Sequence, residues 1–240
     1  VAVSYNKIAA KKPEEVAPFK KFIDAGDLVM GRVVSYVISF TPYAVLSLIA
    51  RAVSRSSPAD LIPLLSVLVM NFVTYYLTSC LTAARLHVQM ALPLDARVPF
   101  VPAFIVVYIL AYGQWGIGYV LIARESEAVG SRILSGEILA KAICLVLFLA
   151  VPTTMVRPEV PGRDAFSWLT RLIYRADAPV NLFPSLHCLA SWVCLRGAWL
   201  LKRIGPWYRW VSLVFTLLVC CSVVLVKQHV LVDIPAGILA

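Results

Sequence analysis

Apolar segments long enough to cross a bilayer recur along this chain, and they constrain its fold more than any other feature. Two of them, residues 61–81 and 100–123, contain no Asp, Glu, Lys or Arg. A helix of about 20 apolar residues crosses the roughly 30 Å of hydrocarbon in a bilayer. The chain is 60% hydrophobic and only 15% charged, more apolar than a soluble fold of 240 residues can bury. We therefore predict an all-α, polytopic membrane helical bundle.

The other apolar runs set the expected number of spans. They cover residues 28–50, 133–154, 183–201 and 210–226, and a last run begins near His229. We expect six spans in the C-terminal part, the last one truncated, and one extra N-terminal helix. Glu137 and Lys141, four residues apart, are expected to pair on one face of a helix. Residues 164–174 have apolar side chains at helical spacing, which predicts a helix along the membrane interface.

The net charge of +9 does not indicate a nucleic-acid partner. The basic residues stand between apolar runs or in residues 1–21, without the interleaved aromatic residues of a nucleic-acid surface. Basic residues that flank spans are typical of membrane proteins. We therefore expect membrane lipids around the chain and no nucleic-acid partner.

Three polar clusters stand at the ends of spans, and topology places them on one side of the membrane. The clusters are Arg157, Ser185 with His187, and Lys227 with His229 and Asp233. The first ends one span, the second begins the next, and the third follows one further crossing. A chain that leaves a face and returns brings all three clusters to the same side, where they can share one site.

Two of the three histidines carry the candidate chemistry. His229 and Asp233 are four residues apart, so on a helix the carboxylate can hold one ring nitrogen while the other attacks. A buried histidine capped by a local carboxylate is the alternative. Ser185 and His187 follow Pro184 and open a span, where free backbone amides favour an anion; an ordinary helix start with a serine cap is the alternative. Arg157 and Lys227 add positive charge for a phosphoryl group.

These motifs resemble a known family. Val156-Arg157-Pro158, Phe183-Pro184-Ser185-Leu186-His187, and the segment from Ser222 through Lys227-Gln228-His229 to Asp233 are similar, in order, to the three signatures of the type 2 phosphatidic acid phosphatase superfamily. The inositol phosphorylceramide synthase-like branch is the most similar. The resemblance extends over residues 62–240 and includes the connector 94–99.

The resemblance implies roles for individual residues. His229 would attack phosphorus and form a phosphohistidine, Asp233 would orient it, and His187 would protonate the leaving alkoxide. Arg157, Lys227 and Ser185 would hold the phosphoryl oxygens, without metal or cofactor. Phosphoryl transfer mainly needs positioning and positive charge, which agrees with these roles.

The sequence departs from the family pattern at three positions. Ala150 stands where a lysine is usual, Leu186 where glycine is commoner, and Val223 where an arginine is usual. The expected function is metal-independent hydrolysis of a lipid phosphate or pyrophosphate monoester. The alternatives are a phosphotransferase of the inositol phosphorylceramide synthase type, and a non-catalytic membrane protein or a cation symporter fragment.

The N-terminal part resembles a different family. Residues 18–65 are similar to a piece of a dicarboxylate or amino acid:cation symporter, but the hairpins that form such a transporter's binding site have no counterpart here. We therefore divide the chain into a symporter-like fragment, 1–61, and a lipid phosphatase-like domain, 62–240, and we expect no transport. The basic link with Lys202, Arg203 and Arg209 predicts a bacterial plasma membrane protein whose site faces the extracytoplasmic side.

Overall fold

A computed structural model describes residues 14–22, 24–26, 29, 32 and 58–240 of the chain. Residues 14–22 and 24–26 are helical. The span predicted for residues 28–50 lies, except for Val29 and Arg32, outside the described residues. The predicted division at residues 61 and 62 falls inside a continuous helix, and the two-domain organisation remains a prediction.

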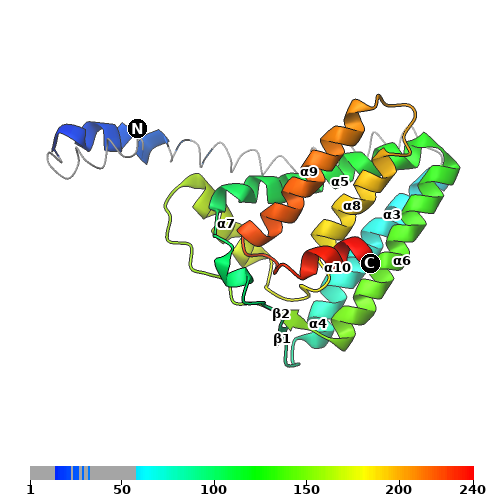
Figure 1. Cartoon of the computed structure of the whole chain (residues 1–240), viewed down its shortest axis with the longest axis horizontal. Helices are drawn as coiled ribbons and strands as arrows, with labels where there is room; N and C mark the ends of the chain where they lie inside the picture. The colour runs from blue at the N-terminus through cyan, green and yellow to red at the C-terminus, as the bar shows by residue number, and fades with distance from the viewer. Residues whose placement is uncertain (1–13, 23, 27–28, 30–31, 33–57) are drawn as a thin grey trace.

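Helices form most of the described chain (Figure 1). The helices are α3 (Pro58–Phe72), the π-helix η1 (Val73–Leu77), α4 (Thr78–Thr82), α5 (Ile105–Glu125), α6 (Glu127–Ala150), α7 (Ala165–Ala176), α8 (Leu186–Ala198), α9 (Trp207–Leu225) and α10 (Asp233–Leu239). Two 3-10 turns, η2 (Asp95–Arg97) and η3 (Pro102–Phe104), and two short parallel strands, β1 (Val88–Gln89) and β2 (Thr153–Thr154), complete the described part.

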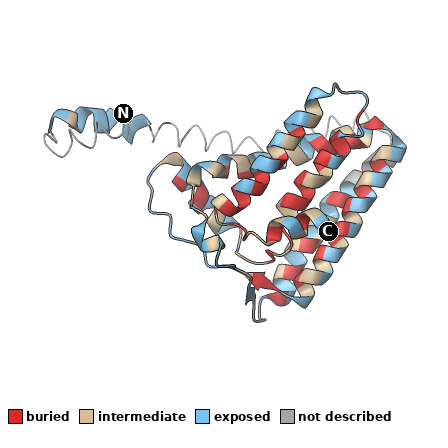
Figure 2. Ribbon diagram, in the orientation of Figure 1, coloured by how far each residue is buried: buried red, intermediate tan, exposed pale blue. Residues whose placement is uncertain are grey.

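The described part of the chain contains four helical segments that are long and apolar enough to cross a bilayer. They are Leu65–Thr82, Pro102–Glu125, Glu127–Ala150 and Trp207–Leu225. Their outward faces carry exposed large apolar side chains, such as Phe72 on α3 and Val214 on α9 (Figure 2). Such faces suit lipid contact. The chain is therefore an all-α, polytopic integral membrane protein, as the apolar runs predict.

Several boundaries differ from the predicted ones. The polar link expected at residues 124–132 is reduced to Ser126, whose side chain accepts a hydrogen bond from the amide of Val129 at 3.2 Å and caps α6. The span expected to reach Thr154 ends at Ala150, because Val151 precedes a proline and Thr153 pairs with β1. The run 183–201 forms α8, which has only 13 residues.

The predicted ion pair inside the bilayer is confirmed. Lys141 Nζ lies 2.8 Å from Glu137 Oε1, and both side chains are buried. The hydroxyl of Tyr119 on α5 donates a second hydrogen bond to the same carboxylate oxygen. A charged pair in hydrocarbon needs such partners, and this one joins α5 to α6.

The C-terminal helices bring the three polar clusters together. Helix α8 packs between α5, α9 and α10. The amide of Ser185 donates to the carbonyl of Asp233 at 3.2 Å, which joins the start of α8 to the start of α10. Gly237 makes this approach possible, because a Cβ atom there would lie 2.4 Å from the Ser185 carbonyl oxygen.

Candidate active site

The loop after α9 is held in one conformation by backbone hydrogen bonds. Lys227 adopts a left-handed backbone conformation with φ 52°. The amides of Gln228 and His229 then both donate to the carbonyl of Val223, at 2.9 and 3.0 Å. The loop therefore presents Gln228 and His229 from a rigid turn at the end of a helix.

Helix α7 supports this loop from the side. The hydroxyl of Tyr174 donates to the carbonyl of Val226 at 2.7 Å. Burial raises the pKa of Tyr174 to about 12, so the phenol keeps its proton and remains a donor at neutral pH. The N-terminal end of α7 is capped by Asp164, which accepts from the amides of Phe166 and Ser167.

Hydrogen bonds fix the orientation and the tautomer of His229. Its Nδ1 lies 3.1 Å from Oδ2 of Asp233 and 3.0 Å from the carbonyl oxygen of Leu182. Both neighbours are acceptors, so Nδ1 carries a proton, and in the neutral ring the lone pair is on Nε2. The amide of Val230 also donates to Oδ2 of Asp233 at 3.0 Å, which holds the carboxylate in place.

His187 lies in the first turn of α8, among aromatic rings of α5. Its ring centroid is 4.3 Å from that of Tyr108 in a stacked arrangement, and 5.0 Å from that of Trp115. The centroids of His187 and His229 are 6.0 Å apart. The Nε2 atom of His187 is buried and has no hydrogen-bond partner in the part of the chain that the structure describes.

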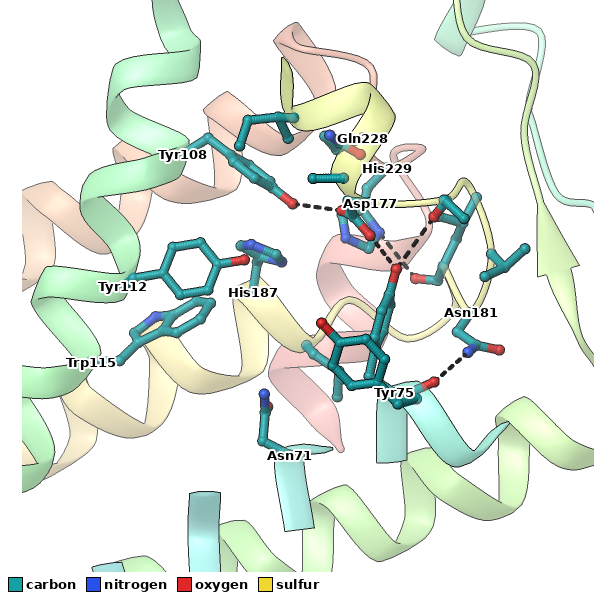
Figure 3. A pocket seen from close by; sticks show the side chains of 17 residues that line it. Asn71, Tyr75, Tyr108, Tyr112, Trp115, Asp177, Asn181, His187, Gln228 and His229 are labelled. Atoms are coloured by element: carbon teal, nitrogen blue, oxygen red, sulfur yellow. Dashed lines mark hydrogen bonds between the residues drawn. The ribbon is translucent and has the colours of Figure 1, made fainter. Parts of the chain in front are cut away.

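A cavity of about 290 Å³ joins the two histidines (Figure 3). Its polar and aromatic lining comes from α3, η1, α5, the loop before α8, the first turn of α8 and the loop after α9. The lining residues of these types are Asn71, Tyr75, Tyr76, Tyr108, Tyr112, Trp115, Asp177, Asn181, His187, Gln228 and His229. The histidines thus face one space large enough for a phosphate with part of its ester.

Arg157 lies behind this cavity and not in its wall. One guanidinium nitrogen donates to Oε1 of Gln228, and the other donates to the carbonyl of Asp177 at 2.5 Å. Because Oε1 of Gln228 faces the arginine, Nε2 of the amide is left as the free donor, and it is buried without a partner among the described residues. Arg157 therefore reaches the cavity through Gln228.

The other two predicted phosphate ligands also point elsewhere. Nζ of Lys227 donates to the carbonyls of Asp95 and Val98, at 3.1 and 2.7 Å. Ser185 is the N-cap of α8, and its hydroxyl accepts from the amide of Cys188 at 3.4 Å. Neither residue lines the cavity. Its anion-attracting groups are the amide of Gln228 and the N-terminal end of α8.

Sequence reasoning gave no role to Asp177 and Gln228. The Asp177 carboxylate faces the cavity and accepts hydrogen bonds from the hydroxyls of Tyr75 and Tyr108, the latter at 3.2 Å (Figure 3). Tyr75 lies on the π-turn η1, a local irregularity that is common at functional sites. Gln228 directly precedes His229 in a recognised motif, which was the available signal. No local pattern pointed to Asp177.

Comparisons with known proteins give two family matches. Residues 81–240 match the family model of the PAP2 superfamily, and residues 1–113 match that of the Sodium:dicarboxylate symporter family. The two matches overlap at residues 81–113. No curated protein and no solved structure matches the chain significantly.

Proposed function

The chain belongs to the PAP2 superfamily, and we propose that it hydrolyses a lipid phosphate or pyrophosphate monoester through a phosphohistidine at His229, without a metal ion. The geometry of His229 carries the proposal. Its Nδ1 proton is held by Asp233 and by the carbonyl of Leu182. Its Nε2 therefore keeps a lone pair, and the ring lines a cavity that it shares with a second histidine.

The proposed reaction has two displacement steps. Nε2 of His229 attacks phosphorus, the P–O bond to the lipid breaks, and His187, which enters this step as the imidazolium, donates its proton to the leaving alkoxide. A water then attacks phosphorus, the P–N bond breaks, and His187 takes the proton of that water. Both rings line the same cavity with their centroids 6.0 Å apart, so one phosphoryl group bound in that cavity would be within reach of both histidines.

Protein dipoles would stabilise the charge on the transferring group. Nε2 of Gln228 is a buried donor beside His229, and Arg157 fixes its direction. The first amides of α8 have no intrahelical acceptor, and they lie at the positive end of the helix dipole. These groups replace the lysine and arginine contacts that Ala150 and Val223 do not provide.

Release of phosphate in the presence of EDTA tests the proposal. The detergent-purified full chain is incubated with phosphatidic acid and with an isoprenyl pyrophosphate. We expect release by the wild type, none above background by His229→Ala, and an alkali-stable, acid-labile phosphoprotein that His229→Ala does not form. His87→Ala is the matched control, because His87 lies in the loop after α4 and outside the cavity.

Two results would contradict the proposed phosphatase activity. Full activity in His229→Ala, or no phosphoprotein and no release from either lipid by the wild type, would contradict the proposal. If lipid phosphorus is instead passed to an added alcohol, the phosphohistidine remains and the second step is transfer.

We also propose that the cavity opens to the extracytoplasmic side of a bacterial plasma membrane. The basic link between α8 and α9 is at the opposite ends of these helices, where the amides of Lys202 and Arg203 bind the Glu125 carboxylate. Lys202→Cys, in a chain without other cysteines, should be protected from a membrane-impermeant maleimide in intact cells. Labelling of intact cells would reverse the orientation.

A further inference from the structure

The charge of the cavity is unusual for a phosphate site. Among the described residues, Asp177 is the only Asp, Glu, Lys or Arg in its lining. Arg157 and Lys227 direct their charges to backbone carbonyls and to Gln228. A phosphate that enters this space therefore meets one carboxylate and no fixed cationic side chain, which is unfavourable unless a positive charge enters with it.

The Asp177 carboxylate is oriented but not neutralised. It accepts one hydrogen bond from Tyr75 and one from Tyr108, each to a different oxygen. It forms no ion pair in the described part of the chain. Each carboxylate oxygen can accept a further hydrogen bond, so the pair of tyrosines leaves capacity for another donor.

Aromatic rings surround the same part of the cavity. Tyr75 and Tyr76 line it from η1, with their centroids 5.2 Å apart at right angles, and Tyr112 lines it from α5. Tyrosine faces attract cations, most strongly where water is excluded. A carboxylate among tyrosine rings is a combination that favours an ammonium group over a neutral hydroxyl.

The distance between this region and the histidines is set by one side chain. The Tyr108 ring stacks on His187, and its hydroxyl donates to Asp177. We call Tyr75, Tyr76 and Asp177 the acidic wall, and His187, Gln228 and His229 the histidine wall. The Asp177 carboxylate is therefore separated from the His187 ring by about the length of a tyrosine side chain, which is a few bonds of a ligand.

We propose that the acidic wall binds an ammonium group that the lipid substrate carries a few atoms from its phosphorus. The inference rests on the proposed function, because the phosphate is placed at the histidine wall. The amine belongs to the lipid itself, as in a long-chain 2-amino-alcohol 1-phosphate, which is a phosphate monoester.

Matched substrates test the proposal. The full-length protein in EDTA is assayed for phosphate release from a 2-amino-alcohol 1-phosphate and from its N-acetyl derivative. We expect kcat/KM to favour the free amine about tenfold. Asp177→Asn should bring this ratio close to one. Because each ratio is taken within one variant, loss of folded protein cancels.

The control and the contrary results are specific. Glu159→Gln removes an exposed carboxylate outside the cavity and should leave the ratio unchanged. A ratio near one in the wild type, or the same preference in Asp177→Asn, overturns the proposal. Activity that EDTA abolishes and Mg²⁺ restores in the wild type, but not in Asp177→Asn, also overturns it, because the carboxylate then holds a metal.

A binding measurement separates this proposal from the proposed function. Phosphoethanolamine and ethyl phosphate differ by one ammonium group, and both are titrated calorimetrically into full-length His229→Ala. Phosphoethanolamine should bind about tenfold more tightly, and Asp177→Asn should remove the difference. Preferential binding of phosphoethanolamine by His229→Ala, together with no phosphate release by the wild type, would retain the ammonium site and reject the phosphatase. Equal or undetectable binding would reject the ammonium site.

Discussion

The two walls of the cavity are built in different ways. In the histidine wall, His229 is fixed by Asp233, four residues away, and by a turn in its own loop. In the acidic wall, Asp177 is fixed by Tyr75 and Tyr108, which are 102 and 69 residues away. The first wall therefore combines hydrogen bonds within one loop with two distant partners, the Leu182 carbonyl and Arg157. The orientation of Asp177 in the second wall depends only on how η1, α5 and the loop after α7 pack together.

We expect the histidine wall to determine the reaction rate and the acidic wall to determine substrate selectivity. A change in the histidine wall should alter the rate for every substrate, since all of them pass through the same nitrogen. A change in the acidic wall, or in the elements that place it, should alter the ratio between substrates. The following variants examine this division, beginning with the largest expected effect.

Asp233→Asn should reduce phosphate release by about 10²-fold to 10³-fold for all substrates. The asparagine amide can donate to Nδ1 of His229, which would favour the tautomer that protonates Nε2 and removes the nucleophile. Steady-state release and the yield of trapped phosphohistidine should fall together. A loss below about tenfold would mean that the Leu182 carbonyl alone fixes the tautomer.

Gln228→Met should lower kcat by about 10²-fold with a small effect on KM, because it removes a donor that acts on the developing charge. Arg157→Lys tests whether the arginine works through Gln228. If it does, the double variant loses little more than Gln228→Met alone. Losses that multiply would place the guanidinium on the phosphate itself, as the family resemblance implies.

Lys227→Met should lower activity about tenfold and also lower the free energy of unfolding by about 1.5–3 kcal/mol. The ammonium group binds the carbonyls of Asp95 and Val98, so its removal loosens the loop that carries His229. Activity and thermal unfolding in detergent are measured on the same sample. A large rise in KM with unchanged unfolding would instead identify Lys227 as a phosphate ligand.

The fold was predictable because hydrocarbon requires long apolar helices. The runs around α5, α6 and α9 located these helices, and Glu137 with Lys141 formed the expected pair. Element ends were less predictable, since the one-residue link at Ser126 depends on a capping bond. The π-turn at Tyr75 could not be predicted from the sequence either, because the Tyr75 carbonyl accepts a hydrogen bond from Asn181, 106 residues away.

The same distinction holds within the site. His229 and Asp233 were found because they lie four residues apart, although the structure places His229 in the loop after α9 and only Asp233 on a helix, α10. The side chain of Lys227 points away from the cavity because Lys227 itself adopts a left-handed backbone conformation outside any helix. The side chain of Arg157 is directed by the carbonyls that it binds near the end of α7. Their charge indicated phosphate, but only tertiary structure shows which oxygen atoms they reach.

The smallest expected effect is at Asp164, which caps α7 and lies far in sequence from both histidines. Asp164 Oδ1 accepts from the amides of Phe166 and Ser167, at 3.0 and 3.1 Å. Helix α7 ends at Ala176, directly before Asp177. Asp164→Ala should cost about 1 kcal/mol, as for other lost N-caps. Fraying of α7 should lower the preference for amine substrates about twofold, because only part of the lost stability is expected to reach Asp177.

Acid provides a second measurement on the same variant. Partial burial alone would raise the pKa of Asp164, but hydrogen bonds from Ser167 and from nearby amides outweigh it and lower the pKa below 3.8. Because the pKa is lower in the folded state, the carboxylate stabilises the fold at every pH above its pKa in the unfolded chain. This stabilisation is lost as the pH falls through its pKa in the folded protein. Wild type and Asp164→Ala should therefore differ in thermal unfolding at neutral pH and converge in strong acid. If activity on phosphatidic acid falls as much as the amine preference, the two walls are not independent.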